Sequence, residues 1–107
     1  MSNYIFIESR DPFESRDTAF IEETALAVKD RGHDVTIFLV QNGVLGARKS
    51  AHRLNRLANA GVTLLADDLS LSERGIKTDE LVEGIQSSGI AELVERIVQK
   101  NTKAIWH

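Results

Sequence analysis

The chain has 107 residues, of which 42% are hydrophobic and 27% are charged, and its formal net charge is −3. This length suits one domain with a single core, and the composition is that of a folded globule. We therefore predict one domain over residues 1–107. The acidic balance argues against binding to bulk nucleic acid or to an anionic membrane surface. The absence of cysteine excludes disulfide bonds, thiolate metal sites and cysteine nucleophiles.

The remaining composition gives no indication of a metal centre, a cofactor or a membrane anchor. His33, His52 and His107 are far apart in the sequence and lack the spacing of a metal motif, so we predict no metal site and no cofactor. No hydrophobic run approaches the roughly 20 residues that cross a bilayer. The first residues lack the basic region of a signal peptide, and we expect a cytoplasmic location.

In chain order, hydrophobic runs and glycine breaks predict strands that alternate with helices. Strands are predicted at residues 3–7, 35–40, 62–65 and 102–106, with a short extended segment at 84–88. Helices are predicted at residues 18–31, 47–60 and 88–101, with single turns near 70–75 and within 76–83. This alternation predicts an α/β fold, a three-layer sandwich with an open, mainly parallel sheet of about five strands flanked by helices. The run at 35–40 has no polar alternation, which is typical of a central strand covered on both faces.

Local signals also predict how the helices begin and end. Asp17 is a candidate N-cap, because its carboxylate can accept hydrogen bonds from the amides of the first turn. Gly32 is expected to end that helix in the left-handed conformation. Ser70 and Glu73 fit a capping box, and Ser88 is a candidate cap for the last helix.

Hydrophobic positions recur with helical spacing in the first and last helices. The first has two adjoining rows, which predicts a wide apolar face that includes Phe20. The last has one stripe, formed by Ile90, Leu93, Val94, Ile97 and Val98.

Candidate ligand-binding residues follow the second and third strands. In parallel sheets, ligands bind at the carboxyl edge, where these loops emerge. Asn42 and Gly43 are similar to part of a phosphate loop but lack its glycine spacing. Asp67 and Asp68 can bind a divalent cation or act as acid and base, but they equally fit a solvated loop and a helix N-cap. No residue is assigned a catalytic role.

A basic segment is the stronger surface signal. The predicted helix at 47–60 carries four cations and no acid, and the Debye length of about 10 Å keeps distant acids from cancelling them. This pattern predicts a surface for an acidic protein partner; its residues are Arg48, Lys49, Arg53 and Arg56. The alternative is that acids of the first helix, such as Glu22 and Glu23, neutralise the segment within the fold. Trp106, in the last strand, indicates a sheet edge or a subunit contact.

Several short motifs together resemble the DsrE/DsrF/DsrH superfamily of small sulfur-relay proteins. They are Gly32-His33-Asp34-Val35, Asn42-Gly43-Val44, Gly61-Val62 and Arg74-Gly75-Ile76. The resemblance covers nearly the whole chain and implies a parallel α/β sheet and homo- or hetero-oligomers of small subunits. It also implies a persulfide-carrying cysteine after the third strand, at a position that falls on Asp67 here. The segment Val40-Gln41-Asn42-Gly43-Val44 is most similar to the DsrH branch, whose members without the cysteine serve as companion subunits.

The resemblance and the missing thiol together predict a non-catalytic subunit or partner-binding protein of a sulfur-relay system. Its expected partner is a protein, either a related subunit or a sulfur carrier, in a homo- or hetero-oligomer. The alternative is a small-molecule or metal-binding protein, or an enzyme, that uses the loops at the carboxyl edge of the sheet.

Overall fold

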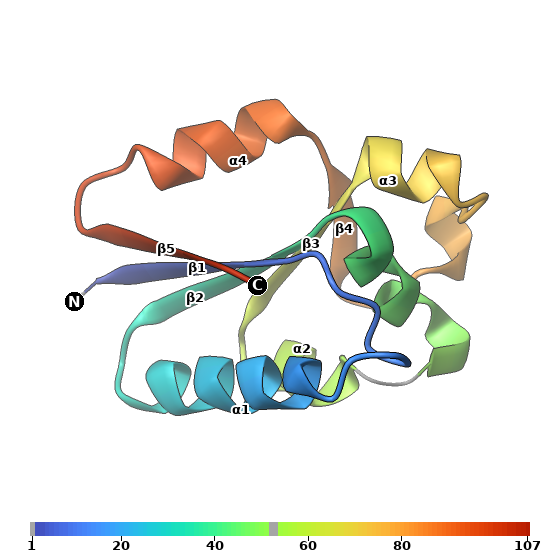
Figure 1. The fold of residues 1–107 in the computed structure, drawn as a ribbon. Helices are drawn as coiled ribbons and strands as arrows, with labels where there is room; N and C mark the ends of the chain where they lie inside the picture. Colours follow the sequence, from blue (N-terminus) through green and yellow to red (C-terminus); the bar gives the residue numbers. More distant parts are fainter. Residues whose placement is uncertain (1, 52–53) are drawn as a thin grey trace.

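A five-stranded parallel sheet forms the middle layer of the protein in the computed structural model, which describes residues 2–51 and 54–107 (Figure 1). The strand order is β4-β3-β2-β1-β5, and each neighbouring pair is parallel. The strands are β1 (Asn3–Glu8), β2 (Asp34–Leu39), β3 (Thr63–Asp67), β4 (Ile85–Ser88) and β5 (Thr102–Trp106). This arrangement confirms the predicted α/β class and the parallel sheet.

Helices cover both faces of the sheet. The longest, α1 (Asp17–Asp30), lies on one face with the short α2 (Asn55–Asn59), and α4 (Ile90–Ile97) lies on the other (Figure 1). Helix α3 (Asp68–Glu73) starts where β3 ends. Three short 3₁₀ segments are η1 (Gln41–Ala47), η2 (Lys49–Ala51) and η3 (Thr78–Glu80). Among the described residues, no helix has the length and hydrophobicity needed to cross a membrane.

The two faces of the sheet are packed unequally. The larger core cluster lies on the face of α1 and α2 and includes Phe6, Ile21, Leu57 and Leu64. The smaller cluster contains Leu93 as its only residue from α4; its other members are Ile5, Ile7, Phe38, Val40 and Leu65. Among the described residues, helix α4 therefore contributes one buried hydrophobic side chain, Leu93, to the core on this face.

Strand β2 matches the prediction of a central strand. Val35, Thr36, Ile37, Phe38 and Leu39 are all buried, and β2 lies between β1 and β3. A continuous apolar run indicates burial on both faces because neither face can then remain in water.

The predicted helix at 47–60 is wrong in extent. Arg48 has an extended backbone, with φ −71° and ψ 142°, and forms an isolated antiparallel bridge to Leu81. The carbonyl of Ala47 accepts a hydrogen bond from the amide of Val82 at 2.8 Å. These contacts replace helical hydrogen bonds, so α2 begins only at Asn55.

Helix α1 begins differently from the prediction. Its N-cap residue is Arg16, which makes no side-chain capping bond, whereas Asp17 lies in the first turn and pairs with Arg10 at 3.3 Å. The buried face of α1 is also narrower than predicted, because Phe20 is exposed. Gly32 has φ +88°, which confirms the predicted left-handed end of the helix.

Two further predicted caps are wrong. The helix near Ser70 begins earlier, with Asp67 as its N-cap. The N-cap of α4 is Gly89, and Ser88 instead donates a hydrogen bond from its hydroxyl to Glu92 at 2.6 Å. Both serines are buried and still make local hydrogen bonds, which explains why they looked like caps in the sequence.

Candidate functional site

Asp67 lies at the carboxyl end of β3, and its carboxylate caps the start of α3. Its Oδ2 accepts hydrogen bonds from the amide of Ser70 at 3.0 Å and from the Ser70 hydroxyl at 2.6 Å. The same hydroxyl accepts a hydrogen bond from the amide of Gln41 at 2.8 Å. This carboxylate therefore joins the β3–α3 turn to the segment after β2, and Asp68 lies beside it in the first turn of α3.

Asn42 lies in the same region and is also engaged. Its Oδ1 accepts from Nε and Nη2 of Arg74, at 3.1 and 3.0 Å. Arg74 donates a further bond from Nη1 to the carbonyl of Ser70 at 3.1 Å. The fold thus brings Asn42 and the Asp67–Ser70 turn together through Arg74, and their role in ligand binding stays a prediction.

Gly43 is required by a close approach of two backbones rather than by positive φ. A Cβ atom at this position would lie 2.2 Å from the carbonyl oxygen of Glu8. The left-handed residue of this turn is Gln41, with φ 50°. The glycine therefore allows η1 to pack against the end of β1.

Among the described residues, the cations of the predicted basic surface do not form one helical face. Arg48 donates from Nε to the carbonyl of Leu45 at 3.1 Å, and its guanidinium lies 5.9 Å from the ring centre of Phe13. Arg56 forms an exposed ion pair with Glu23 of α1, as the alternative reading of this segment anticipated. Lys49 is exposed, and Arg53 lies outside the described residues.

A carboxylate–imidazole pair at the end of β1 was not predicted. Glu8 is only 6% exposed, and Nδ1 of His107 lies 2.9 and 2.8 Å from its two carboxylate oxygens. The backbone amide of His107 donates to the carbonyl of Ile7, and its carbonyl accepts from the amide of Ser9, both at 2.8 Å. The partners are 99 positions apart, and only the pairing of β5 with β1 brings them together.

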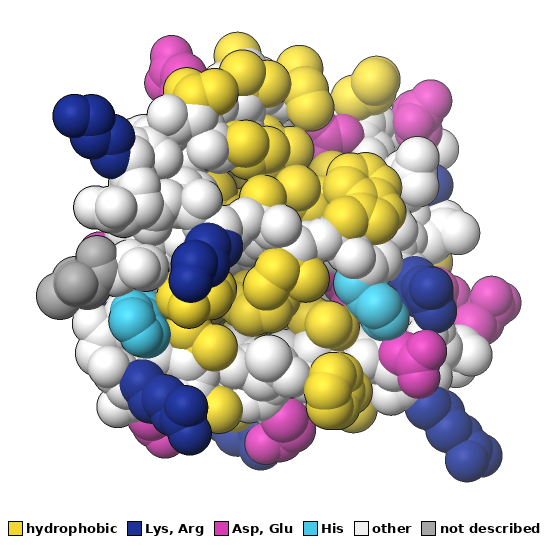
Figure 2. Space-filling view, turned by 60° about the vertical axis from the view of Figure 1, so that its left-hand side comes forward, with side chains coloured by type: hydrophobic (Ala, Val, Ile, Leu, Met, Phe, Trp, Pro, Cys, Tyr) yellow, Lys and Arg dark blue, Asp and Glu magenta, His cyan; other side chains and the backbone are white. Residues whose placement is uncertain are grey.

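Hydrophobic side chains gather on the outer side of α4 and on β5. Figure 2 shows hydrophobic side chains, in yellow, gathered in the upper part of the view. We call this the α4–β5 surface; its residues are Ile90, Val94, Ile97, Val98 and Trp106, all exposed. Trp106 is paired in register with Ile7, which places it on the sheet face that α4 covers. The predicted α4 stripe is thus largely turned outward, with only Leu93 buried.

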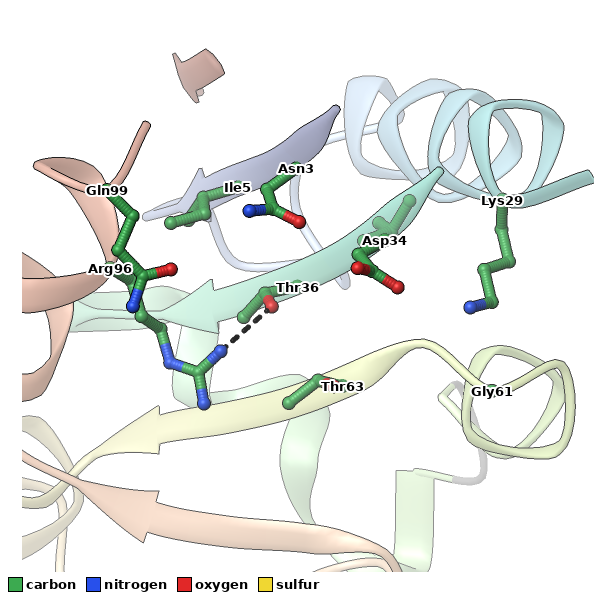
Figure 3. A pocket seen from close by; sticks show the side chains of 10 residues that line it. Asn3, Ile5, Lys29, Asp34, Thr36, Gly61, Thr63, Arg96 and Gln99 are labelled. Atoms are coloured by element: carbon green, nitrogen blue, oxygen red, sulfur yellow. Dashed lines mark hydrogen bonds between the residues drawn. The ribbon is translucent and has the colours of Figure 1, made fainter. Parts of the chain in front are cut away.

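A polar pocket of about 320 Å³ opens at the opposite, amino edge of the sheet (Figure 3). Its floor is formed by alternate residues of β1, β2 and β3, on the face that α4 covers. Its walls come from the end of α4 and from the last turn of α1. The lining side chains include Lys29, Asp34, Thr36, Arg96 and Gln99.

Solved structures of other proteins share this fold. The chain is similar to a solved structure titled as a protein of unknown function, MTH1491 from Methanobacterium thermoautotrophicum, with a TM-score of 0.84, 18% identity and full coverage of both chains. It is also similar to the ychN protein from E. coli, with a TM-score of 0.89, 15% identity and full coverage of both chains. These likenesses show a shared fold.

The family follows from the sequence itself. The DsrE/DsrF-like family model matches residues 2–103, and the chain belongs to this family. A search of curated proteins finds no match. Within the family, this chain is a member without cysteine.

Proposed function

We propose that this chain is a non-catalytic, protein-binding subunit of a sulfur-relay or related assembly. A persulfide needs a thiolate sulfur to carry it, and this chain has none. The single observation that carries the proposal is the α4–β5 surface, where five large hydrophobic side chains are exposed together. Contiguous exposed apolar patches are typical of protein-interaction sites.

The partner we propose for the α4–β5 surface is a second copy of the chain. A two-fold axis brings the same patch of both copies together, so that apolar side chains meet apolar side chains. Strand β5 is at the end of the described sheet, and its outer edge offers unpaired backbone groups for pairing. Trp106, 63% exposed, supplies the kind of aromatic anchor that dominates interface energies.

The basic residues support this role less strongly. Arg56 already has an acidic partner in Glu23, and Arg48 is held by a carbonyl group and by the Phe13 ring. We therefore propose the α4–β5 surface as the main contact. Lys49 remains a candidate for a second contact with an acidic partner.

The alternative, a ligand or metal site at the carboxyl edge, has less support from the geometry. The carboxylate of Asp67 and the amide of Asn42 are both hydrogen-bonded within the fold. A ligand there would have to replace these bonds, which costs free energy unless it supplies equivalent ones.

Light scattering coupled to size exclusion tests the proposal. The wild-type chain is expected to be an oligomer, and the Ile90→Glu/Val94→Glu variant is expected to dissociate, because a buried unpaired carboxylate is costly. Leu69→Glu is the matched control, since Leu69 and Ile90 are both 64% exposed and both lie in the first turn of a helix. A wild-type chain that stays monomeric, or a variant that assembles like the wild type, would contradict the proposal.

A further inference from the structure

The amino-edge pocket has its own chemistry, separate from the α4–β5 surface. Asn3, Asp34, Thr36 and Thr63 alternate with core residues along their strands and so share one sheet face. Helix α4 ends at Ile97 and leaves this part of the face open. The result is a polar hollow built on rigid strands, with charged groups on both walls (Figure 3).

Arg96 is held in position by a chain of hydrogen bonds. The Ser88 hydroxyl donates to Glu92 at 2.6 Å, and Oε2 of Glu92 accepts from Nε and Nη2 of Arg96, at 3.1 and 2.9 Å. Nη1 of Arg96 donates to the hydroxyl of Thr36 at 3.4 Å. The guanidinium is therefore oriented over the pocket floor before any ligand binds.

This orientation leaves a fork of donors on Arg96. A guanidinium has five N–H groups, and three of them are used in the bonds to Glu92 and Thr36. One N–H on each terminal nitrogen has no acceptor among the described residues. Two such donors on a planar group match the two oxygens of a carboxylate.

Two further charges face the same space without partners. The side chains of Asp34 and Lys29 make no hydrogen bond or ion pair within residues 2–51 and 54–107. Figure 3 shows both of them directed toward the pocket, with Asp34 between Arg96 and Lys29. Gly61 also lines the pocket near the lysine; its φ of +88° favours glycine, and a Cβ there would make only an ordinary contact with Cε of Lys29, at 3.4 Å.

We propose that this pocket binds a free acidic α-amino acid, such as glutamate or aspartate. The α-carboxylate binds the Arg96 fork, the ammonium binds Asp34, and the side-chain carboxylate binds Lys29. The order of charges along the pocket, positive, negative, positive, is the complement of the order in this ligand. A simple anion would leave Asp34 unpaired, and a simple amine would leave Arg96 unpaired.

The spacing agrees with this ligand. Asp34 and Thr36 are two residues apart on β2, about 7 Å along the strand, and Arg96 is bound over Thr36. An α-amino acid separates its nitrogen and carboxyl carbon by about 2.5 Å. A hydrogen bond of about 2.8 Å from the nitrogen, and one of the same length from a carboxyl oxygen about 1.2 Å beyond the carbon, give a bridge that reaches up to about 9 Å.

Titration of the ¹⁵N-labelled full chain with L-glutamate tests the inference by NMR. We expect saturable shifts at the amides of Asp34, Thr36 and Thr63. Glutarate, which has both carboxylates but no ammonium, is expected to bind about tenfold more weakly than glutamate. L-Alanine has no side-chain carboxylate and is expected to bind without the contribution of Lys29 to the affinity.

Variants then assign the contacts. Asp34→Asn and Arg96→Lys are each expected to weaken glutamate binding about tenfold, whereas Lys29→Gln weakens glutamate and leaves alanine unchanged. Asp30→Asn and Lys100→Gln are matched controls, since both residues are exposed and outside the pocket. The inference is overturned if shifts do not saturate at high millimolar glutamate, if they map to the carboxyl edge, or if Asp34→Asn binds like the wild type. Because oligomer state is measured separately, failure here leaves the proposed function intact.

Discussion

Nδ1 of His107 lies within hydrogen-bond distance of both carboxylate oxygens of Glu8, at 2.9 and 2.8 Å. Glu8 closes β1 and is buried, and His107 directly follows β5. Their contact therefore fastens the end of the edge strand to the neighbouring central strand. It also lies next to Trp106, the aromatic residue of the α4–β5 surface.

Replacing the imidazole should leave the buried carboxylate with only the long hydrogen bond from the amide of Arg10 to its Oε2, at 3.3 Å. We expect His107→Ala to lower the free energy of unfolding by about 1–3 kcal/mol, because Oε1 of the buried Glu8 then lacks its hydrogen bond from the imidazole. Urea denaturation measures this loss. The double variant Glu8→Gln/His107→Ala should lose less than the sum of the two single changes, since both remove the same interaction. Additive losses would show that the pair contributes no coupling.

Gly43 should tolerate no side chain. In Gly43→Ala the new Cβ would meet the Glu8 carbonyl oxygen at 2.2 Å, so one of the two backbones must move. That oxygen also accepts a hydrogen bond from the amide of Val40 at 3.0 Å. We expect a loss of about 2–3 kcal/mol in thermal or urea unfolding.

Gly32→Ala is the matched control for this prediction. Gly32 has φ +88°, but a Cβ added there would meet nothing within 4 Å, so only backbone strain of about 1–2 kcal/mol applies. An equal loss in the two variants would contradict a steric role for Gly43.

Asp67 should behave as a helix cap. Asp67→Ala removes the acceptor of the Ser70 amide and hydroxyl, and we expect a loss of about 0.5–2 kcal/mol in unfolding free energy. Asp68→Ala, in the first turn of α3, should cost less, because it removes only a favourable charge near the helix dipole. Thermal shift with Mg²⁺ on the wild type separates this role from a metal site. Marked stabilisation by Mg²⁺ that Asp67→Ala abolishes would favour the metal alternative.

Glu92 should make stability depend on pH on the acid side. The hydrogen bond from the Ser88 hydroxyl and then the bond from Arg96 lower the pKa of Glu92 below its ordinary value of 4.5. A lowered folded pKa gives stabilisation that is complete above 4.5 and is lost as pH falls through the folded pKa. The effect is small, about 0.3–0.5 kcal/mol, as expected of an (i, i+4) pair that solvent still reaches.

Unfolding of Glu92→Gln between neutral and acid pH measures this contribution. The variant should be less stable than the wild type at neutral pH, and the difference should shrink as the solution is acidified. Glu95→Gln, at an exposed position on the same helix, should show no such convergence. A constant difference between Glu92→Gln and the wild type would exclude the proposed linkage.

The elements of the sheet could be predicted because each depends on local hydrophobic pattern. The continuous run of β2 indicated a strand covered on both faces, and the observed strand is buried from Val35 to Leu39. Gly32 indicated the end of α1, because a left-handed residue there favours glycine. The prediction for the segment after β2 was wrong because it also relied on local pattern alone. The helical spacing at 47–60 was visible in the sequence, but the pairing of Arg48 with Leu81 was not.

The candidate sites depended more on distant contacts. The basic segment was visible in the sequence, whereas the pairing of Arg56 with Glu23 and the contact of Arg48 with Phe13 required the packed fold. The amino-edge pocket left no sequence signal at all. Its charged residues, Lys29, Asp34 and Arg96, come from three elements that only the sheet brings together.

By itself, the sequence determined the α/β class, the parallel sheet, the resemblance to the DsrE family and the absence of a thiol. These properties follow from residue types and from periodicities along the chain. Only the tertiary structure decided that Glu8 binds His107, that Asp67 caps α3, and that the apolar stripe of α4 faces outward. The physical reason is that hydrogen bonds and burial depend on which distant segments meet. Strand order and packing determine these long-range contacts, which cannot be read from the pattern of residues along the chain.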